Sequence, residues 1–180
     1  MRKFLNVRTI ILLFGLLILT FWLVRTPLAD ATGKKAPDWS LKGMDGKAIN
    51  FSDFSGKVVI VNLWATWCPP CRREIPDFIE LQKEYKEQGL VIIGISLDQS
   101  EAPVKPFVEK NSINYPVVMG NSEVAQLYGN IRSIPTTFIV DSDGNIVESF
   151  FGLRSKEIFE ESIKPLLKKV KSPAKAKPVE

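Results

Sequence analysis

The chain has 180 residues, of which 45% are hydrophobic and 24% are charged, and its formal net charge at pH 7 is +4. These values are ordinary for a soluble fold and suit one globular domain with appendages. The positive charge belongs to the two ends: residues 1–31 carry four basic residues against one acid, and residues 168–180 carry five lysines against one acid. The segment between them is mildly acidic, so the charge distribution argues against nucleic-acid binding.

The first predicted element is an uncharged apolar run at residues 9–24, which follows three basic residues. The run fits a membrane anchor, for which about 20 apolar residues are needed. It also fits a secretory signal peptide with an A-x-A cleavage site at residues 29–31. Both interpretations place the rest of the chain outside the cytoplasm, because flanking basic residues stay inside. We expect residues 1–31 to form an uncleaved single-pass anchor of the cell membrane; release to the periplasm after cleavage near Ala31 is the alternative.

The middle of the chain alternates between strand and helix patterns. Apolar, β-branched runs at residues 58–65 and 90–96 predict strands buried on both faces. Residues 69–88, between these runs, have apolar side chains at helical spacing and end at Gly89. The other predicted elements are a small hairpin around 44–47, a helix at about 101–111 after Ser100 as its N-cap, a strand at 115–119, a helix at 122–129, a hairpin of 136–140 and 146–152 around the turn 141–145, and a last helix at about 156–169.

A parallel β-α-β unit followed by a β-hairpin and a closing helix predicts an α/β sandwich. We assign residues 32–168 to this domain. Residues 169–180 are rich in lysine, proline and alanine, a composition typical of a basic disordered tail.

Both cysteines of the chain lie at one junction of the predicted fold. Cys68 and Cys71, with two prolines between them, fall where the strand 58–65 leads into the helix 69–88. This is the carboxyl edge of the sheet, where α/β folds place their sites. Cys68 would stand at the helix N-terminus, where the helix dipole and free backbone N–H groups favour a thiolate. The prolines fit the first turn, whose N–H groups have no helical partner.

Other uses of the cysteine pair are disfavoured. A structural disulfide across so small a loop constrains the unfolded chain little. A zinc site needs four ligands, whereas the chain has two cysteines and no histidine. We therefore expect a dithiol that exchanges electrons, with no metal and no other cofactor.

Two motifs carry a resemblance to a known family. The stretch WATWCPPCRREIP, residues 64–76, together with SIPTTFIVD, residues 133–141, resembles the thioredoxin superfamily, and within it the membrane-anchored thiol-disulfide oxidoreductases of the TlpA/ResA type, which have a redoxin or AhpC/TSA-like domain. The similarity covers about residues 36–168, and residues 36–57 resemble the redoxin N-terminal extension. It implies a thioredoxin-like three-layer sandwich with a mixed central sheet, an N-terminal hairpin and a helix-strand insertion at about 97–130.

The resemblance assigns roles to matching residues. Cys68 matches the nucleophile that forms a mixed disulfide with a client, and Cys71 matches the resolving thiol that closes the Cys68–Cys71 bridge. Pro135 matches the cis-proline that faces the dithiol, and Ile134 before it would offer backbone hydrogen bonds to an extended client segment. Trp67 matches the aromatic residue that shapes the docking surface.

Glu74 is a further catalytic candidate. It lies three residues after Cys71, on the same face of the predicted helix, and resembles a glutamate of the membrane-anchored relatives. A carboxylate there can accept the proton of Cys71 as that thiol attacks the mixed disulfide. The alternative is a solvated helix charge beside Arg72 and Arg73, themselves expected at the surface. Thioredoxin proper has a buried aspartate where this chain has Asn62, which does not titrate.

The resemblance implies an extracytoplasmic reductant of protein disulfides, for example in cytochrome c maturation. Its partners would be disulfide-bearing clients and a transmembrane thiol-disulfide electron donor. One alternative is a peroxiredoxin-like thiol peroxidase, but the pattern Pro-x-x-x-Thr-x-x-Cys is absent because Ala65 stands three residues before Cys68. Another alternative is a non-catalytic, membrane-anchored module that senses redox state.

Overall fold

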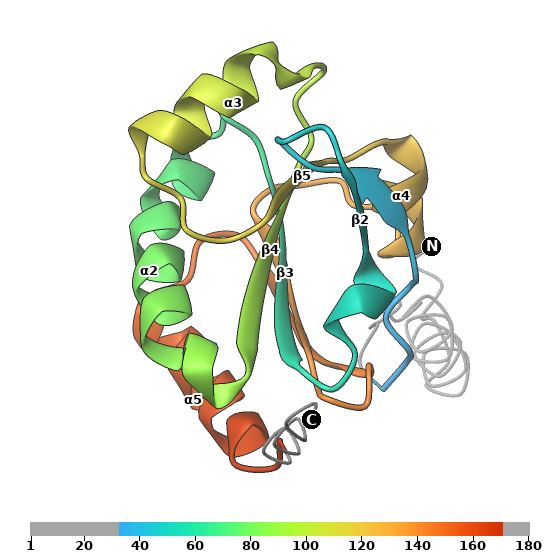
Figure 1. The fold of residues 1–180 in the computed structure, drawn as a ribbon, viewed down its shortest axis with the longest axis vertical. Coiled ribbons are helices and arrows are strands. Elements are labelled where there is room, and N and C mark those ends of the chain that lie inside the picture. The colour runs from blue at the N-terminus through green and yellow to red at the C-terminus, as the bar shows by residue number, and fades with distance from the viewer. Residues whose placement is uncertain (1–32, 171–180) are drawn as a thin grey trace, which may run out of the picture. The chain divides into compact units, whose positions relative to one another are not determined.

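The computed structural model describes residues 33–170, whose arrangement is shown in Figure 1. Within this range no helix combines the length and the apolar character needed to cross a membrane. The predicted anchor, residues 1–31, and the tail beyond residue 170 lie outside the described range.

The centre of the domain is a five-stranded mixed sheet with the order β5-β4-β3-β6-β7. Strands β3, β4 and β5 are parallel to one another, and β6 and β7 continue the sheet in antiparallel pairing. The bounds of the strands are β3 Val58–Trp64, β4 Leu90–Ser96, β5 Val117–Met119, β6 Thr136–Val140 and β7 Ile146–Phe151. The predicted mixed α/β sandwich is confirmed.

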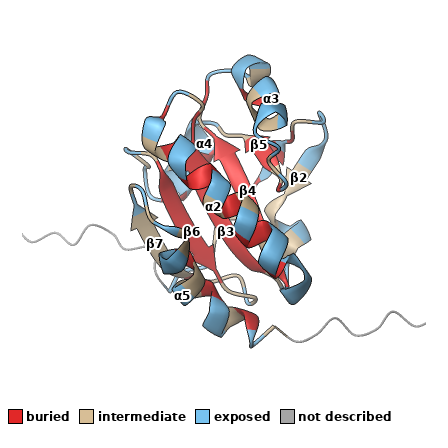
Figure 2. Cartoon of the chain, turned by 90° about the vertical axis from the view of Figure 1, so that its left-hand side faces the viewer, coloured by how far each residue is buried: buried red, intermediate tan, exposed pale blue. Residues whose placement is uncertain are grey.

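Helices cover one face of this sheet, and a mixed layer covers the other (Figures 1 and 2). Helices α2 (Pro69–Tyr85), α3 (Glu101–Lys110) and α5 (Lys156–Leu167) pack over the first face. On the second face lie α4 (Ser122–Leu127), the hairpin of β1 (Ser40–Lys42) and β2 (Ala48–Asn50), and the short helix η1 (Phe51–Phe54).

Strand β3 shows why the sheet carries two cores. All seven of its residues are buried, because helices or loops cover both faces. Side chains alternate between the faces of a strand, so Val58, Ile60 and Trp64 join the core beneath α2 whereas Val59, Val61 and Leu63 join the opposite core. Burial on both faces explains why the sequence of β3 is a continuous apolar run, the pattern from which this strand was predicted.

The predicted elements differ from the observed ones mainly at their ends. Helix α2 ends at Tyr85, and residues 86–88 form a 3-10 turn, η2, before Gly89, whose positive φ of 99° ends the helical segment. Ser100 occupies the predicted N-cap position of α3, although its hydroxyl makes no capping hydrogen bond.

Candidate active site

The dithiol lies at the carboxyl end of β3, in the first turn of α2. Cys68 is the N-cap residue, with an extended backbone (φ −90°, ψ 106°), and the two prolines fill the first two helical positions. Proline suits these positions because its missing N–H has no helical partner there. Cys68 and Cys71 form a disulfide across this turn, with their Cα atoms 5.3 Å apart.

Backbone groups from two segments lie close to the sulfur of Cys68. The N–H of Cys71 donates a hydrogen bond to Cys68 Sγ over 3.3 Å. The carbonyl oxygen of Ile134 lies 3.7 Å from the same sulfur. Both cysteines are almost fully covered by their surroundings. A sulfur at an N-cap that receives an N–H bond is electrostatically favoured as a thiolate.

An exposed aromatic residue and a largely buried segment lie beside the disulfide. Trp67, immediately before Cys68, has 67% of its surface exposed. The Ile134–Pro135 segment, whose peptide bond is cis, is half-buried at Ile134 and buried at Pro135, and it also adjoins the disulfide. The pairing of β3 with β6 stops at Thr136, so Ile134 lies just outside the sheet beside the sulfur. The structure therefore brings together Trp67, Ile134 and Pro135 around the disulfide.

Glu74 is buried, with 1% of its surface exposed. Its Oε1 accepts a hydrogen bond from the backbone N–H of Arg154 over 2.7 Å, while Oε2 has no partner among residues 33–170. Burial raises the pKa of Glu74 to about 7, against the opposing effects of the Arg154 N–H and of the Arg154 charge. The interpretation of Glu74 as a solvated helix charge is wrong.

Comparisons with known proteins agree with this geometry. The model of the AhpC/TSA family matches residues 32–149. A thiol-disulfide oxidoreductase ResA of Bacillus thuringiensis subsp. konkukian is 38% identical over 135 residues, which cover 74% of this chain and 78% of that protein. A ResA of Geobacillus thermodenitrificans is 34% identical over 166 residues, covering 88% of this chain and 95% of that protein. A solved thiol:disulfide interchange protein of the thioredoxin family from Chlorobium tepidum TLS superposes with a TM-score of 0.70 at 38% identity, covering 77% of this chain and 99% of that one.

The chain belongs to the AhpC/TSA family. Its relatives are named thiol-disulfide oxidoreductases, and its fold and its vicinal cysteines agree with that activity. The resemblance drawn from the two sequence motifs is thereby confirmed, and the chain is a thiol-disulfide oxidoreductase.

One contact of this oxidoreductase was not predicted from its sequence. The N–H that holds Glu74 comes from Arg154, 80 residues further along the chain, in the loop between β7 and α5. The loop is fixed beside the site because Gly152 N–H donates to the carbonyl of Pro135 over 2.8 Å. No local pattern marks such a contact, since any non-proline residue supplies an N–H.

The other residues considered for the site lie on α2 and β3. Arg72 and Arg73 are exposed on α2. Asn62 is buried on β3 and donates a hydrogen bond to Thr137 Oγ1 over 2.9 Å, so a neutral pair occupies that position beneath the site. Among residues 33–170, no group of three or more His, Cys, Asp or Glu side chains is arranged to hold a metal ion.

Proposed function

We propose that the chain is a membrane-anchored, extracytoplasmic reductant of protein disulfides, with cytochrome c maturation as one such task. The observation that carries the proposal is the Cys68–Cys71 disulfide at the start of α2, with an N-cap sulfur between Trp67 and the Ile134–Pro135 segment. The relatives named thiol-disulfide oxidoreductases support it.

The first half of the reaction opens the client disulfide. In the reduced enzyme, the thiolate of Cys68 attacks one sulfur of the client. A bond forms between Cys68 Sγ and that sulfur, the client disulfide breaks, and the other client sulfur leaves as a thiolate. The Cys71 N–H and the helix dipole lower the free energy of the attacking thiolate.

The second half releases the client. The thiol of Cys71 loses its proton and attacks Cys68 Sγ, which closes the intramolecular disulfide and expels the second client thiolate. Two electrons have then passed from the enzyme to the client. Glu74, one helical turn beyond Cys71, accepts the proton in this scheme, and a pKa of about 7 suits a group that must both take and return a proton near neutral pH. A transmembrane thiol-disulfide donor would reduce the enzyme again.

Single substitutions distinguish the roles of the two cysteines. Cys71→Ser leaves Cys68 able to attack but removes the resolving thiol, so mixed disulfides with clients should accumulate and appear on non-reducing gels. Cys68→Ser should trap no client. Equal behaviour of the two variants would contradict the assigned roles.

The direction of electron flow follows from the reduction potential of the wild-type couple in a glutathione buffer. We expect a value near the roughly −270 mV of thioredoxin, as a reductant requires. A value near about −120 mV would make the protein an oxidant.

A further inference from the structure

A buried carboxylate holds the loop that joins β3 to the dithiol helix. Asp98 follows β4 by two residues and has 6% of its surface exposed. Its Oδ2 accepts a hydrogen bond from the backbone N–H of Thr66 over 2.9 Å, and its Oδ1 accepts one from the hydroxyl of Thr66 over 2.6 Å. One residue of the loop is thus bound at both its backbone and its side chain by a single carboxylate.

Asp98 is itself fixed to the end of β4. The hydroxyl of Ser96 donates to Asp98 Oδ2 over 2.8 Å, and the N–H of Asp98 donates back to Ser96 Oγ over 3.1 Å. Strands β3 and β4 are neighbours whose last paired residues are Trp64 and Ser96, so the carboxylate reaches across from one strand end to the other.

Burial of the Asp98 carboxylate without a cation does not by itself stabilise the fold. None of the ion pairs formed within residues 33–170 includes Asp98. Taking a carboxylate out of water raises the free energy of the folded state unless hydrogen bonds offset it. Three donors converge on Asp98, two of them from Thr66, and hydrogen bonds to a charged acceptor are shorter and stronger than neutral ones. The feature is therefore well suited to fixing Thr66 in one position.

The loop fixed in this way carries the reactive groups. Thr66 is followed directly by Trp67 and Cys68, and the segment is closed by a hydrogen bond from Cys68 N–H to the carbonyl of Ala65 over 3.2 Å. A surface groove of about 420 Å³ lies between Trp67 and residues 97–103, and Asp98 lines part of it. Asp98 thus connects the two sides of this groove.

We propose that Asp98, acting through Thr66, is a positioning residue for thiol-disulfide exchange, which sets the direction in which Cys68 meets a client disulfide. The proposal rests on the role of Cys68 as the nucleophile. Exchange requires the attacking sulfur to approach in line with the bond that breaks, and a misplacement of about 1 Å can slow a reaction about a hundredfold. Trp67, on the same loop, would guide the client into that line.

The test measures Cys68 alone, in the Cys71→Ser background, with two reagents. A synthetic peptide closed by one disulfide must dock beside Cys68 in a defined orientation, whereas iodoacetamide is small and needs no docking surface. Thr66→Val removes the hydroxyl donor with little change in shape, and Asp98→Asn replaces one accepting oxygen by a donor. We expect each to slow the reaction with the peptide about tenfold or more. The high-pH rate of alkylation by iodoacetamide should stay within about twofold.

Two further variants distinguish positioning from general stability. Thr66→Ser restores the hydroxyl, so its rate with the peptide should lie within about threefold of the Thr66 protein. Gln82→Met removes two buried hydrogen bonds at the opposite end of β4, to Leu90 and Ile92. It should lower the stability and leave both rates unchanged.

Several outcomes would overturn the proposal. One is a peptide rate that stays at the parent value in Thr66→Val or Asp98→Asn. Another is a parallel fall of the peptide and iodoacetamide rates, which would give Asp98 a structural role only. A third is a fall in the peptide rate of Gln82→Met as large as that of Thr66→Val. Failure of the parent Cys71→Ser protein to react with the peptide at all would instead contradict the proposed function.

Discussion

At the scale of single residues, Glu74 occupies a site that opposes its own ionisation. Desolvation outweighs the Arg154 N–H and the Arg154 charge, and the nearby charge of Asp77 acts in the same direction as desolvation. The result is a carboxyl group with a pKa of about 7 in the core beneath the dithiol helix. Asn62, buried in the strand below, cannot substitute for it because an amide does not titrate.

The first consequence concerns client release. Glu74→Gln keeps the size of the side chain and its acceptor for the Arg154 N–H, but removes the titratable group. If Glu74 takes the proton of Cys71, the variant should release a pre-formed mixed disulfide at Cys68 more slowly, at the low end of the roughly 10²–10⁴-fold typical of general-base loss. The measurement is single-turnover release across about pH 5 to 9, and superimposable profiles for the two proteins would exclude a proton-transfer role.

The same substitution should change how stability depends on pH. The pKa of Glu74 is raised from 4.5 in the unfolded chain to about 7 in the folded one, so the folded state binds more protons in this window. The free energy of unfolding therefore falls as the pH rises from about 4.5 to about 7, by about 3 kcal/mol in full, and stays low above.

Urea unfolding of the oxidised protein at about pH 5 and about pH 8 measures this effect. The difference in stability between Glu74→Gln and the parent should be larger at the higher pH, in favour of the variant. Glu109→Gln, at an exposed position of α3, is the control for loss of a carboxylate. A difference that does not change with pH would contradict a raised pKa.

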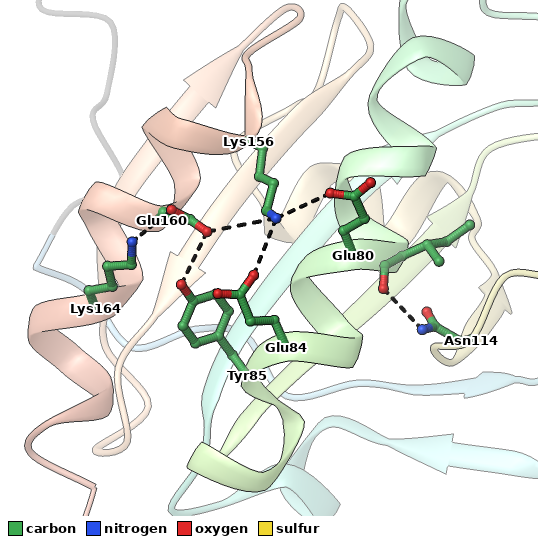
Figure 3. A network of polar contacts seen from close by, with 8 residues as sticks. Glu80, Glu84, Tyr85, Asn114, Lys156, Glu160 and Lys164 are labelled. Carbon is green, nitrogen blue, oxygen red and sulfur yellow. Dashed lines mark hydrogen bonds and ion pairs between the residues drawn. The ribbon is translucent and has the colours of Figure 1, made fainter.

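At the scale of helices and strands, a cluster of charges joins α5 to the dithiol helix (Figure 3). Lys156 Nζ lies 3.1 Å from Glu80 Oε2, 3.2 Å from Glu84 Oε2 and 3.9 Å from Glu160 Oε1. Tyr85 adds a hydrogen bond from its hydroxyl to Glu160 over 3.1 Å. Because Lys156 begins α5 two residues after Arg154, this cluster also holds the loop whose N–H binds Glu74.

Lys156→Gln should lower the urea midpoint at low salt, because Glu80 and Glu84 then lose their shared cation and Glu160 keeps only its ion pair with Lys164. The loss should shrink at about 1 M salt, where charges are screened beyond about 3 Å. Lys42→Gln, which removes the single ion pair with Glu101, is the matched control and should have the smaller effect. Equal effects of the two variants at both salt concentrations would show that the three pairs of Lys156 do not act together.

The features that could be predicted from the sequence are local ones, whereas those that could not depend on contacts between residues far apart in the chain. The apolar runs of β3 and β4 and the helical spacing of α2 are local signals, so the sheet, the dithiol helix and the place of the cysteines followed from them. The contacts that tune the site join distant residues: Thr66 to Asp98 across 32 positions, and Glu74 to Arg154 across 80. Their geometry depends on how strands and loops pack, for which the local pattern holds no signal.

At the scale of the whole domain, the reactive groups gather at one edge of the sheet. Cys68 follows the end of β3, and Asp98 follows the end of the parallel strand β4. Strand β6 runs antiparallel to β3, so Pro135, just before its start, lies at the same edge. Arg154 follows β7, which runs antiparallel to β6 and so also ends there. The carboxyl-edge location expected of an α/β site is here assembled from four strand ends.

The described chain enters the domain at the other edge of the sheet. Gly33 N–H donates to the carbonyl of Ile146 over 2.7 Å, and Ala36 N–H donates to the carbonyl of Gly144 over 2.9 Å. Gly144 belongs to the turn after β6, and Ile146 is the first residue of β7, so both acceptors lie at the end of the sheet opposite the dithiol. Gly33, the first described residue, thus lies at the end of the sheet opposite the disulfide.

The apolar run at residues 9–24 is the segment expected to anchor the protein in the membrane. In a bacterial host, the full-length chain should stay in the membrane pellet after a carbonate wash, and its domain should be digested by protease added from outside. Arginine at both Leu16 and Leu17 should abolish the attachment, because each charge near the centre of the run opposes insertion by about 2.5–3.5 kcal/mol. Ala31→Leu destroys the A-x-A site and, for an uncleaved anchor, should leave the apparent mass of the protein unchanged.

A different result would identify a signal peptide. A soluble protein that begins at Thr32 in the parent, and whose processing is blocked by Ala31→Leu, would show that the run is removed after export. The protein would then meet the proposed transmembrane donor by diffusion. Retention at the membrane would instead confine the enzyme and the proposed transmembrane donor to one surface, which would raise the effective concentration of each for the other without any additional contact.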